Sequence, residues 1–350
     1  METNNYIIGI PKEIKQNENR ISLIPDEVKL ITDKKFKVYM QKDAGINANY
    51  KDEEYINAGA IICDNIEEIY NKANLIIKVK EPQESEYNLI TDKHIIITFF
   101  HFAGNKKLIN AMVKSKAICI AYETIQLDNG YYPILAPMSI IAGEKSMIDA
   151  DIYINEKDKE KIVISIIGVG NVGRASAIKA LELGYTNINL IDKNYAKIKD
   201  LEKYNLNVYE MTTENLVNLM KKSNIVIGSI YNTGKKAQRL ISKYLLELMP
   251  EPAIFMDVAI DQGGMTELSI PTTIENPLIE YKHIKIYCVP NIPSNLPQEA
   301  SKKLSKSIFP YLEIILNNDT IESAMNTSSE LKKGINIYKG YFYHYSLIKD

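Results

Sequence analysis

KIVISIIGVGNVGRASAIKALELGYTNINLID, residues 161–192, is the stretch that decides the fold. Residues 162–167 form a short apolar run rich in β-branched side chains, which predicts a buried strand. Three glycines follow at G-x-G-x-x-G spacing, and apolar residues then recur at helical intervals over 175–183. A second apolar run, 188–191, ends in Asp192. The stretch therefore predicts a complete strand–helix–strand unit.

Each of the three glycines has a task that a side chain would obstruct. Gly168 makes the tight turn, Gly170 lets the backbone approach a pyrophosphate, and Gly173 lets the helix pack on the strand. The N-terminus of the helix then faces the phosphates with unpaired N–H groups and a partial positive charge. Asp192 would accept hydrogen bonds from the adenosine ribose, and its charge would repel a 2′-phosphate. These residues predict NAD, rather than NADP, as the cofactor.

The composition narrows the class of protein. A chain of 350 residues suggests two domains, and a hydrophobic content of 45% can build a core in each. The net charge of -2 gives no electrostatic reason to expect a nucleic-acid or membrane partner. No targeting leader precedes the first apolar run, and no run approaches the ~18 apolar residues of a membrane span. We expect a soluble, cytoplasmic protein that acts on a small molecule.

The cysteines give no sign of a metal site. Cys63, Cys119 and Cys288 are widely spaced and lie in no C-x-x-C or histidine-rich neighbourhood. Each is therefore expected to be a small buried apolar residue. No metal is expected.

Strands and helices alternate along the rest of the chain, which predicts an α/β fold with parallel sheets. The predicted strands are 6–10, 37–41, 75–79, 94–100, 117–121, 225–230, 253–260 and 284–289, and the predicted helices are 27–32, 52–58, 66–72, 107–114, 135–154, 216–221, 243–248 and 298–316. Two of these helices, 135–154 and 298–316, are long and bracket the glycine-rich region. The chain is therefore expected to leave a first domain, build a second one, and return.

Several short segments together resemble one known family. They are IGIPKEIKQNENRISLIP, IIKVKEP, FFHFAG, IAYETIQ, LAPMS, VAIDQGG, PTT and YCVPNIP. In order and spacing they resemble alanine dehydrogenase, within the wider family that includes the NAD-binding subunit of proton-translocating transhydrogenase. The resemblance covers nearly the whole chain. It implies two Rossmann-like domains with a cleft between them: a discontinuous substrate domain, 1–132 and 300–350, and a central NAD-binding domain, 133–299.

Four residues match substrate or catalytic positions of that family. Arg20 matches the arginine that grips the substrate carboxylate, which a planar guanidinium binds through two parallel hydrogen bonds. Lys80 matches the lysine that contacts the 2-oxo acid and polarises its carbonyl. His101 matches the proton donor and acceptor, and Asp261 matches the acid near the nicotinamide. All four follow predicted strands, where an open α/β sheet places its ligands.

Further residues match the cofactor side or stand close to Lys80. Ser139 in LAPMS and Asn291 in YCVPNIP match cofactor-side positions. Lys78, Glu81 and Glu123 are candidates to hold Lys80 in place.

Three segments depart from the family pattern. Residues 140–144, IIAGE, stand where the family has Glu-Val-Ala-Gly-Arg, and EKDKEK at 156–161 replaces a stretch rich in glycine and proline. GSIYNTGKKAQ at 228–238 replaces GAxxxPGxxAP. These changes bear on assembly, domain closure and the exact substrate more than on the redox chemistry.

The resemblance implies an NAD-dependent L-alanine dehydrogenase, an enzyme that reversibly converts alanine to pyruvate and ammonia. Within enzymes the alternative is a related amino-acid dehydrogenase with another small substrate. Outside them, the alternatives are a transhydrogenase-type NAD-binding subunit and a non-catalytic NAD-binding protein. The resemblance also implies a homo-oligomer, a dimer or a hexamer.

Overall fold

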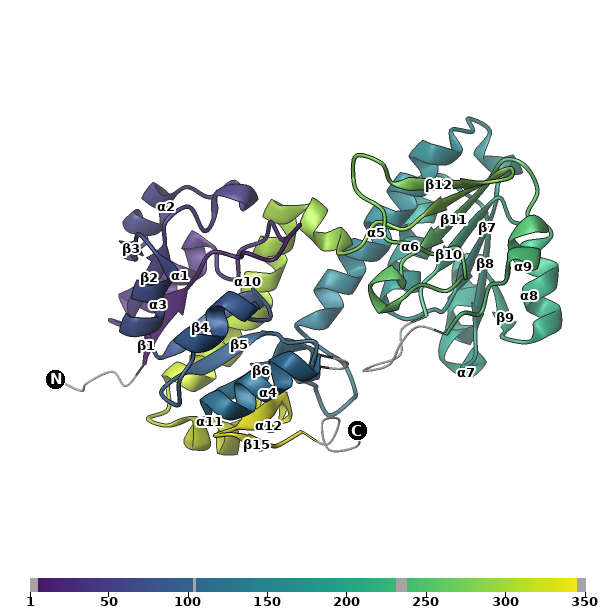
Figure 1. Ribbon diagram of the computed structural model, residues 1–350. Coiled ribbons are helices and arrows are strands. Elements are labelled where there is room, and N and C mark those ends of the chain that lie inside the picture. The colour runs from purple at the N-terminus through teal and green to yellow at the C-terminus, as the bar shows by residue number, and fades with distance from the viewer. Residues whose placement is uncertain (1–5, 103–104, 231–237, 345–350) are drawn as a thin grey trace. The chain divides into compact units, whose positions relative to one another are not determined.

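The structure is a computed structural model that describes residues 6–102, 105–230 and 238–344 (Figure 1). The chain divides into two compact units. The first comprises Met1–Met138 and Ser294–Asp350, and the second comprises Ser139–Pro293. Each unit contains one sheet and its helices, which confirms the predicted α/β class with two mostly parallel sheets.

The sheet of the first unit has the strand order β15-β14-β6-β5-β4-β1-β2-β3. Strands β1 to β6 pair in parallel, whereas β14 is antiparallel to both β6 and β15. The order along the chain reverses between β1 and β4, which form the switch point of the sheet. The bounds are β1 Ile7–Ile10, β2 Lys37–Gln41, β3 Ile61–Cys63, β4 Leu75–Lys80, β5 Ile95–Phe99, β6 Ile118–Ala121, β14 Ile335–Tyr338 and β15 Tyr341–Phe342.

Helices from both ends of the chain belong to this unit. Asn65 and Asn105 begin α3 and α4, where their side chains accept the N–H groups of Glu68 and Leu108, as favoured N-cap residues do. The bounds are α1 Pro25–Asp33, α2 Asp52–Asn57, α3 Ile66–Lys72, α4 Lys106–Ser115, α10 Pro297–Leu316, α11 Ile321–Thr327 and α12 Ser329–Gly334, with 3-10 turns η1 Ile46–Ala48, η2 Glu84–Leu89 and η3 Tyr122–Thr124.

The sheet of the second unit has the order β12-β13-β11-β10-β7-β8-β9. It is parallel except for β12, which is antiparallel to β13 at the edge. Its switch point lies between β7 and β10. The bounds are β7 Val163–Ile167, β8 Asn187–Asp192, β9 Asn207–Glu210, β10 Ile225–Gly228, β11 Ala253–Asp257, β12 Leu278–Tyr281 and β13 Ile284–Tyr287.

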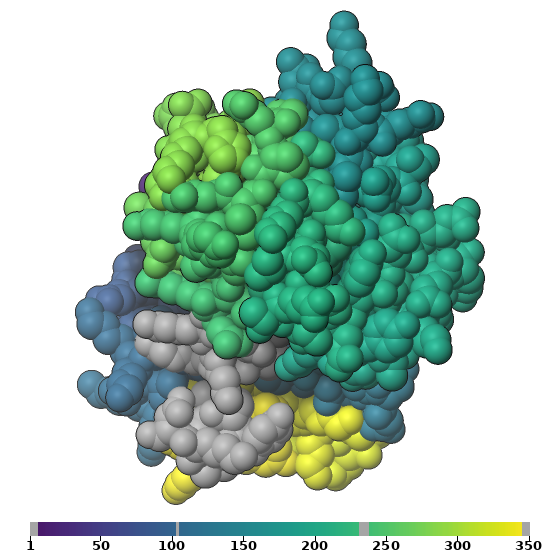
Figure 2. All heavy atoms as spheres, turned by 90° about the vertical axis from the view of Figure 1, so that its right-hand side faces the viewer, coloured from purple at the N-terminus to yellow at the C-terminus, as the bar shows by residue number. Residues whose placement is uncertain are grey.

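Helices cover this second sheet. Helices α8 and α9 lie on the right-hand side in Figure 1, which is the side that faces the viewer in Figure 2. The long helix α5 begins in the first unit and contributes Ala142, Met147, Ala150 and Ile154 to the apolar core of the second. The bounds are α5 Leu135–Ile154, α6 Asn171–Glu182, α7 Tyr195–Ile198, α8 Thr213–Met220 and α9 Lys243–Glu247, with 3-10 turns η4 Lys159–Lys161, η5 Lys199–Tyr204, η6 Ile260–Gln262 and η7 Ile292–Asn295.

The structure corrects the predicted elements in two respects. The sheets are not purely parallel, because the unpredicted strands β12, β14 and β15 run antiparallel at sheet edges. The strand predicted to reach residue 260 ends at Asp257. Its carboxylate accepts the N–H groups of Ala259 and Met265, so that the chain turns there instead of continuing.

In the described part of the chain, no helix is both long and apolar enough to cross a membrane. The three cysteines are free and buried, as the sequence predicts. They therefore pack as small apolar side chains.

Candidate functional site

The first group of predicted site residues lies at the switch point of the first sheet. Lys80 is the last residue of β4, and His101 follows the paired strand β5 by two residues. Arg20 lies in the loop between β1 and α1, at residues 11–24. Because the carboxyl ends of parallel strands share one edge of a sheet, all three residues belong to the same edge of this unit.

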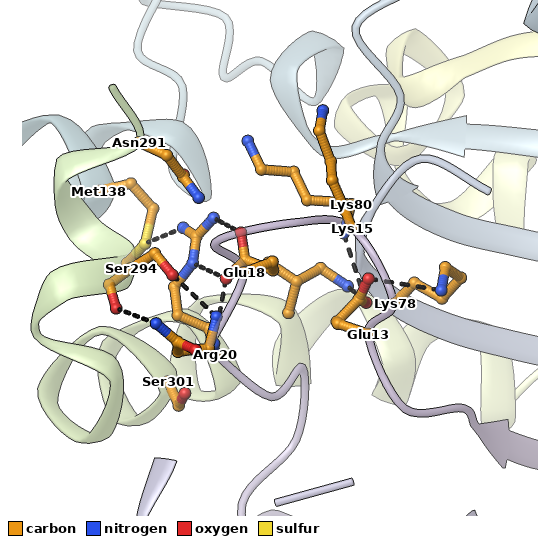
Figure 3. A network of polar contacts seen from close by, with 12 residues as sticks. Glu13, Lys15, Glu18, Arg20, Lys78, Lys80, Met138, Asn291, Ser294 and Ser301 are labelled. Atoms are coloured by element: carbon orange, nitrogen blue, oxygen red, sulfur yellow. Dashed lines mark hydrogen bonds and ion pairs between the residues drawn. The ribbon is translucent and has the colours of Figure 1, made fainter. Parts of the chain in front are cut away.

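A buried ion pair orients Arg20. Its Nε and Nη2 donate to the two carboxylate oxygens of Glu18 at 2.7 and 2.6 Å, and both residues are almost completely buried. Nη1 lies 3.3 Å from the sulfur of Met138 (Figure 3). Since two parallel bonds fix the plane of a guanidinium, Glu18 sets the direction in which Arg20 presents its other edge.

The loop around Arg20 is anchored by the segment that returns to the first unit. The N–H of Asn19 donates to Oγ of Ser294 at 2.8 Å, and the N–H of Ile21 donates to Oγ of Ser301 at 2.9 Å. The two backbone N–H groups that flank Arg20 are thus held by serines that lie 275 and 280 residues further along the chain. Residues from the C-terminal part of the chain therefore hold the N-terminal loop that carries Arg20.

Glu123 holds the main chain at His101. One carboxylate oxygen accepts the N–H of His101 at 2.6 Å, and the other accepts the N–H of Phe100 at 3.3 Å. His101 has a left-handed backbone with φ of 48°, and its ring stacks on Phe99 with an interplanar angle of 8°. Burial raises the pKa of Glu123 to about 7.

The surroundings of His101 favour its neutral form. Desolvation, followed by the positive charges of Lys80, Lys15 and Arg20, lowers the pKa of His101 well below its ordinary value. Although the residue is exposed, the charges of the three cations lower the pKa of His101 in the same direction as desolvation. A neutral imidazole at neutral pH can accept a proton.

The three residues expected to hold Lys80 have other main partners. The ammonium group of Lys78 lies 3.4 Å from a carboxylate oxygen of Glu13 and 3.1 Å from one of Glu86. Glu81 pairs with Lys15 at 2.5 Å. Glu123, as described above, binds the backbone of the His101 segment.

Two buried carboxylates that hold neighbouring groups were not singled out from the sequence, namely Glu13 and Glu18. Both stand in the loop motif after β1, within IGIPKEIKQNENRISLIP. The sequence feature that could have identified them is their position in a loop at the carboxyl end of a strand, where open α/β sheets bind their ligands.

The second group of site residues lies at the switch point of the second sheet. Gly168 follows β7 with φ of 88°, and a Cβ there would lie 2.8 to 2.9 Å from atoms of Ile230. A Cβ on Gly173 would overlap the carbonyl oxygen of Gly168, whereas one on Gly170 would meet nothing within 4 Å. Gly170 is the N-cap of α6, so open space adjoins the N-terminus of this helix.

Side chains from neighbouring strands complete the glycine turn. Asp192, the last residue of β8, accepts the N–H of Val169 at 2.7 Å and that of Asn194 at 2.8 Å. Ser229, just after β10, donates to the carbonyl oxygen of Gly168 at 2.6 Å. A carboxylate has about four acceptor positions, so these two bonds do not exhaust Asp192.

Asp261 and Asn291 are brought together in the same unit. Asp261 lies in η6, and its two carboxylate oxygens accept the N–H of Asn291 at 3.1 Å each. Asn291 has a left-handed backbone with φ of 51°. Ser139 lies on a different element, in the second turn of α5.

The two groups of predicted site residues differ in the chemical groups that they present. Within residues 6–102, 105–230 and 238–344, no three His, Cys, Asp or Glu side chains gather in a way that could hold a metal. What the structure offers instead is a set of cations in one unit and a glycine-lined helix N-terminus in the other.

Comparison with known proteins identifies the family. The chain matches the alanine dehydrogenase/PNT N-terminal domain over residues 9–142 and the corresponding C-terminal domain over residues 157–345. It is 33% identical to an alanine dehydrogenase of Staphylococcus haemolyticus, over 96% of this chain and 94% of that protein. A solved L-alanine dehydrogenase superposes with a TM-score of 0.89 at 29% identity, over 97% of both chains. A transhydrogenase of Sinorhizobium meliloti shares the fold, with a TM-score of 0.82 at 21% identity over 97% of this chain and 99% of that one. The chain therefore belongs to the alanine dehydrogenase/PNT family.

Proposed function

We propose that this protein is an NAD-dependent L-alanine dehydrogenase. The reaction is L-alanine, water and NAD⁺ giving pyruvate, ammonium, NADH and a proton, and it is reversible. The observation that carries the proposal is the buried, Glu18-oriented Arg20 at the same sheet edge as Lys80 and His101. Relatives named alanine dehydrogenase that align over nearly the full chain support it.

Arg20 and Lys80 are proposed to bind the acid. Glu18 binds the Nε and Nη2 edge of Arg20 and so fixes the plane in which the guanidinium would meet the substrate carboxylate. Lys80, at the end of β4, contacts the 2-oxo acid, and its charge draws electron density from the carbonyl carbon. Because both cations sit on strand ends or anchored loops, they bind the acid in one orientation.

His101 is proposed to move protons. Its lowered pKa keeps the ring neutral at neutral pH, so it can take a proton from water as that water attacks the imine formed from alanine. In the reductive direction the imidazolium returns a proton as water leaves. Asp261 is proposed to assist this proton transfer.

NAD, when bound, supplies the carbon that accepts or donates the hydride. The residues present fit a dinucleotide, because open space adjoins Gly170 at the N-terminus of α6 and an acid ends β8. We assign the pyrophosphate to the glycine turn and the adenosine ribose to Asp192, with Ser139 and Asn291 on the cofactor side. NADH should accordingly be preferred to NADPH, and equal catalytic efficiency with the two would contradict the role of Asp192.

The deciding experiment follows NADH consumption by the purified protein. Pyruvate with ammonium should support turnover, and omission of ammonium should abolish it. Other 2-oxo acids tested in parallel distinguish alanine from another small amino acid as the substrate. Exchange of hydride between two nucleotides in place of this reaction would favour a transhydrogenase-type subunit.

We also propose a role for each unit, a cellular location and an oligomeric state. The first unit is the substrate domain and the second is the NAD-binding domain, which rests on the site residues that each contains. The protein is proposed to act in the cytoplasm as a homo-oligomer, with a dimer as the minimum and a hexamer weakly favoured. Light scattering tests the assembly, since an active monomer of about 40 kDa would exclude it.

A further inference from the structure

A fully buried charged cluster lies beside the end of β4, outside the group of residues assigned to the reaction. The side chain of Lys78 is 0% exposed, those of Glu13 and Glu86 are 4% and 1% exposed, and Tyr70 donates its hydroxyl to Glu86 at 3.0 Å. Buried charges are costly unless they are paired and hydrogen-bonded. A cluster of this kind therefore calls for a reason beyond the stability of the core.

Glu13 occupies a position where the sheet cannot supply a partner. The ladder between β1 and β4 ends at the pair Gly9 and Ile76, and the register between β4 and β5 shifts between Ile77 and Lys80. Beyond that point one oxygen of Glu13 accepts the N–H of Val79 at 2.6 Å and, at 3.4 Å, that of Lys80. The Glu13 side chain thus takes the place of a strand partner at the end of β4. Without it, the N–H of Val79 would be buried and unpaired.

The other oxygen of Glu13 faces the Lys78 ammonium group (Figure 3). Glu86, which lies in η2, holds the same ammonium group. Gln83 fixes Glu86 in turn, because its N–H donates to the second carboxylate oxygen at 2.7 Å. Burial, partly offset by the charge of Lys78, raises the pKa of Glu13 to about 7. Both oxygens are therefore held at defined places, one by the backbone of β4 and one by a buried cation.

Glu13 belongs to the loop between β1 and α1, which also carries Arg20. Its carboxylate consequently ties that loop to the strand that ends in Lys80. We propose that Glu13 is a positioning residue that sets the spacing between Arg20 and Lys80, the two cations that bind one substrate acid. This inference rests on the proposed function, because it assumes that both cations meet the same 2-oxo acid.

The test compares three variants of Glu13 in the full-length enzyme. Glu13→Leu removes the acceptor at similar volume, and the Michaelis constant for pyruvate should rise on the order of 10-fold to 100-fold while NADH binding stays within about twofold. Glu13→Asp keeps the charge but shortens its reach, and it should show a rise of the same kind. Glu13→Gln keeps an acceptor oxygen for the N–H of Val79 and should recover most of the affinity for pyruvate.

Glu27 provides a matched control. It is another buried carboxylate of the first unit, 5% exposed, and it accepts the hydroxyl of Ser305 at 2.7 Å. Glu27→Leu should lower stability without raising the Michaelis constant for pyruvate. An equal rise in both variants would mean a general loss of structure and would overturn the proposal, as would a folded Glu13→Leu or Glu13→Asp variant with unchanged kinetics.

A second readout does not depend on activity. Amide hydrogen exchange in a peptide that spans residues 75–82 should become faster in Glu13→Leu and Glu13→Asp, and should stay near the wild-type rate in Glu13→Gln and Glu27→Leu. If the wild-type enzyme fails to turn over any 2-oxo acid, the proposed function fails while this measurement still decides whether Glu13 fixes the end of β4. Unchanged exchange in Glu13→Asp would reject the positioning role by itself.

Discussion

The two units have the same strand order around their switch points, but different kinds of residue lie at the two switch points. The first sheet runs β3-β2-β1-β4-β5-β6 and the second runs β9-β8-β7-β10-β11-β13. At the first switch point lie charged side chains, among them Arg20, which pairs with Glu18, and Lys15, which pairs with Glu81. At the second lie glycines, a helix N-terminus and one acid. The same architecture can thus offer either side-chain charge or bare backbone to a ligand.

The two proposed ligands would account for this difference. A small acid needs a few strong, directed charges, and these require counter-charges such as Glu18 for Arg20. A pyrophosphate needs many weak donors at close range, which backbone N–H groups provide only where no side chain intervenes. We therefore expect the first site to be sensitive to the loss of a side chain and the second to the addition of one.

The largest effect is expected at His101. The change His101→Ala removes the group that transfers protons, which typically contributes ~100-fold to ~10,000-fold in rate. NADH binding should stay nearly unchanged, because His101 belongs to the first unit. Steady-state turnover and NADH fluorescence titration check the two halves of this prediction. A variant that retains more than about a tenth of wild-type turnover would assign the role to another residue.

The second-largest effect is expected from loss of the Arg20 guanidinium group. Arg20→Ala should raise the Michaelis constant for pyruvate on the order of 10-fold to 150-fold, since hydrogen bonds to charged groups contribute roughly 1.5 to 3 kcal/mol. The variant also leaves Glu18 buried without its main cation, so some loss of stability should accompany it. Arg20→Lys is the control that restores the charge without the planar geometry. An unchanged Michaelis constant in Arg20→Ala would count decisively against the assignment.

In the second unit, two glycines should respond differently to the same methyl group. Gly173→Ala would press on the carbonyl oxygen of Gly168, and such overpacking typically costs about 1 to 3 kcal/mol of stability. Gly170→Ala has open space around its Cβ and φ of -76°, so the fold should be unaffected. Its methyl group would stand where the pyrophosphate is assigned, and NADH affinity should fall on the order of 10-fold. Thermal unfolding and NADH titration of both variants separate these outcomes. Wild-type NADH affinity in Gly170→Ala would contradict the assignment of the pyrophosphate to this turn.

The smallest effect concerns stability and pH. Burial raises the pKa of Glu13 and of Glu123 from 4.5 to about 7. Between these values the folded chain keeps protons that the unfolded chain releases, so the free energy of unfolding falls as pH rises. This contribution is complete below about pH 4.5 and is lost above about pH 7.

Glu13→Gln removes one of these two titrations. The fall in the free energy of unfolding between pH 5 and pH 7.5 should then be smaller than in the wild type, by on the order of 1 kcal/mol. Denaturant unfolding at several pH values gives the difference between the two proteins, which cancels groups common to both. Identical pH profiles would show that Glu13 does not titrate in this range.

Much of the fold was predictable because it depends on local pattern. The helix predicted at 135–154 has those bounds in the structure, and the long helix near the C-terminus differs only in beginning at Pro297. The edge strands were missed for a physical reason. Strands such as β15 have two residues, and β9 reads NVYE, so neither offers an apolar run of its own. Their pairing with a neighbouring strand, not their composition, makes them strands.

The sequence by itself determined the glycine turn, the acid at the end of β8 and the succession of strands and helices. Those features depend on residues within a few positions of one another, where backbone sterics and periodicity act directly. Only the tertiary structure decided which groups hold Arg20 and the end of β4. Ser294 and Ser301 come from the far end of the chain to anchor the Arg20 loop, and Glu13 reaches across to β4. A buried polar group takes whatever partner the fold brings within about 3 Å, and no spacing along the sequence records that distance.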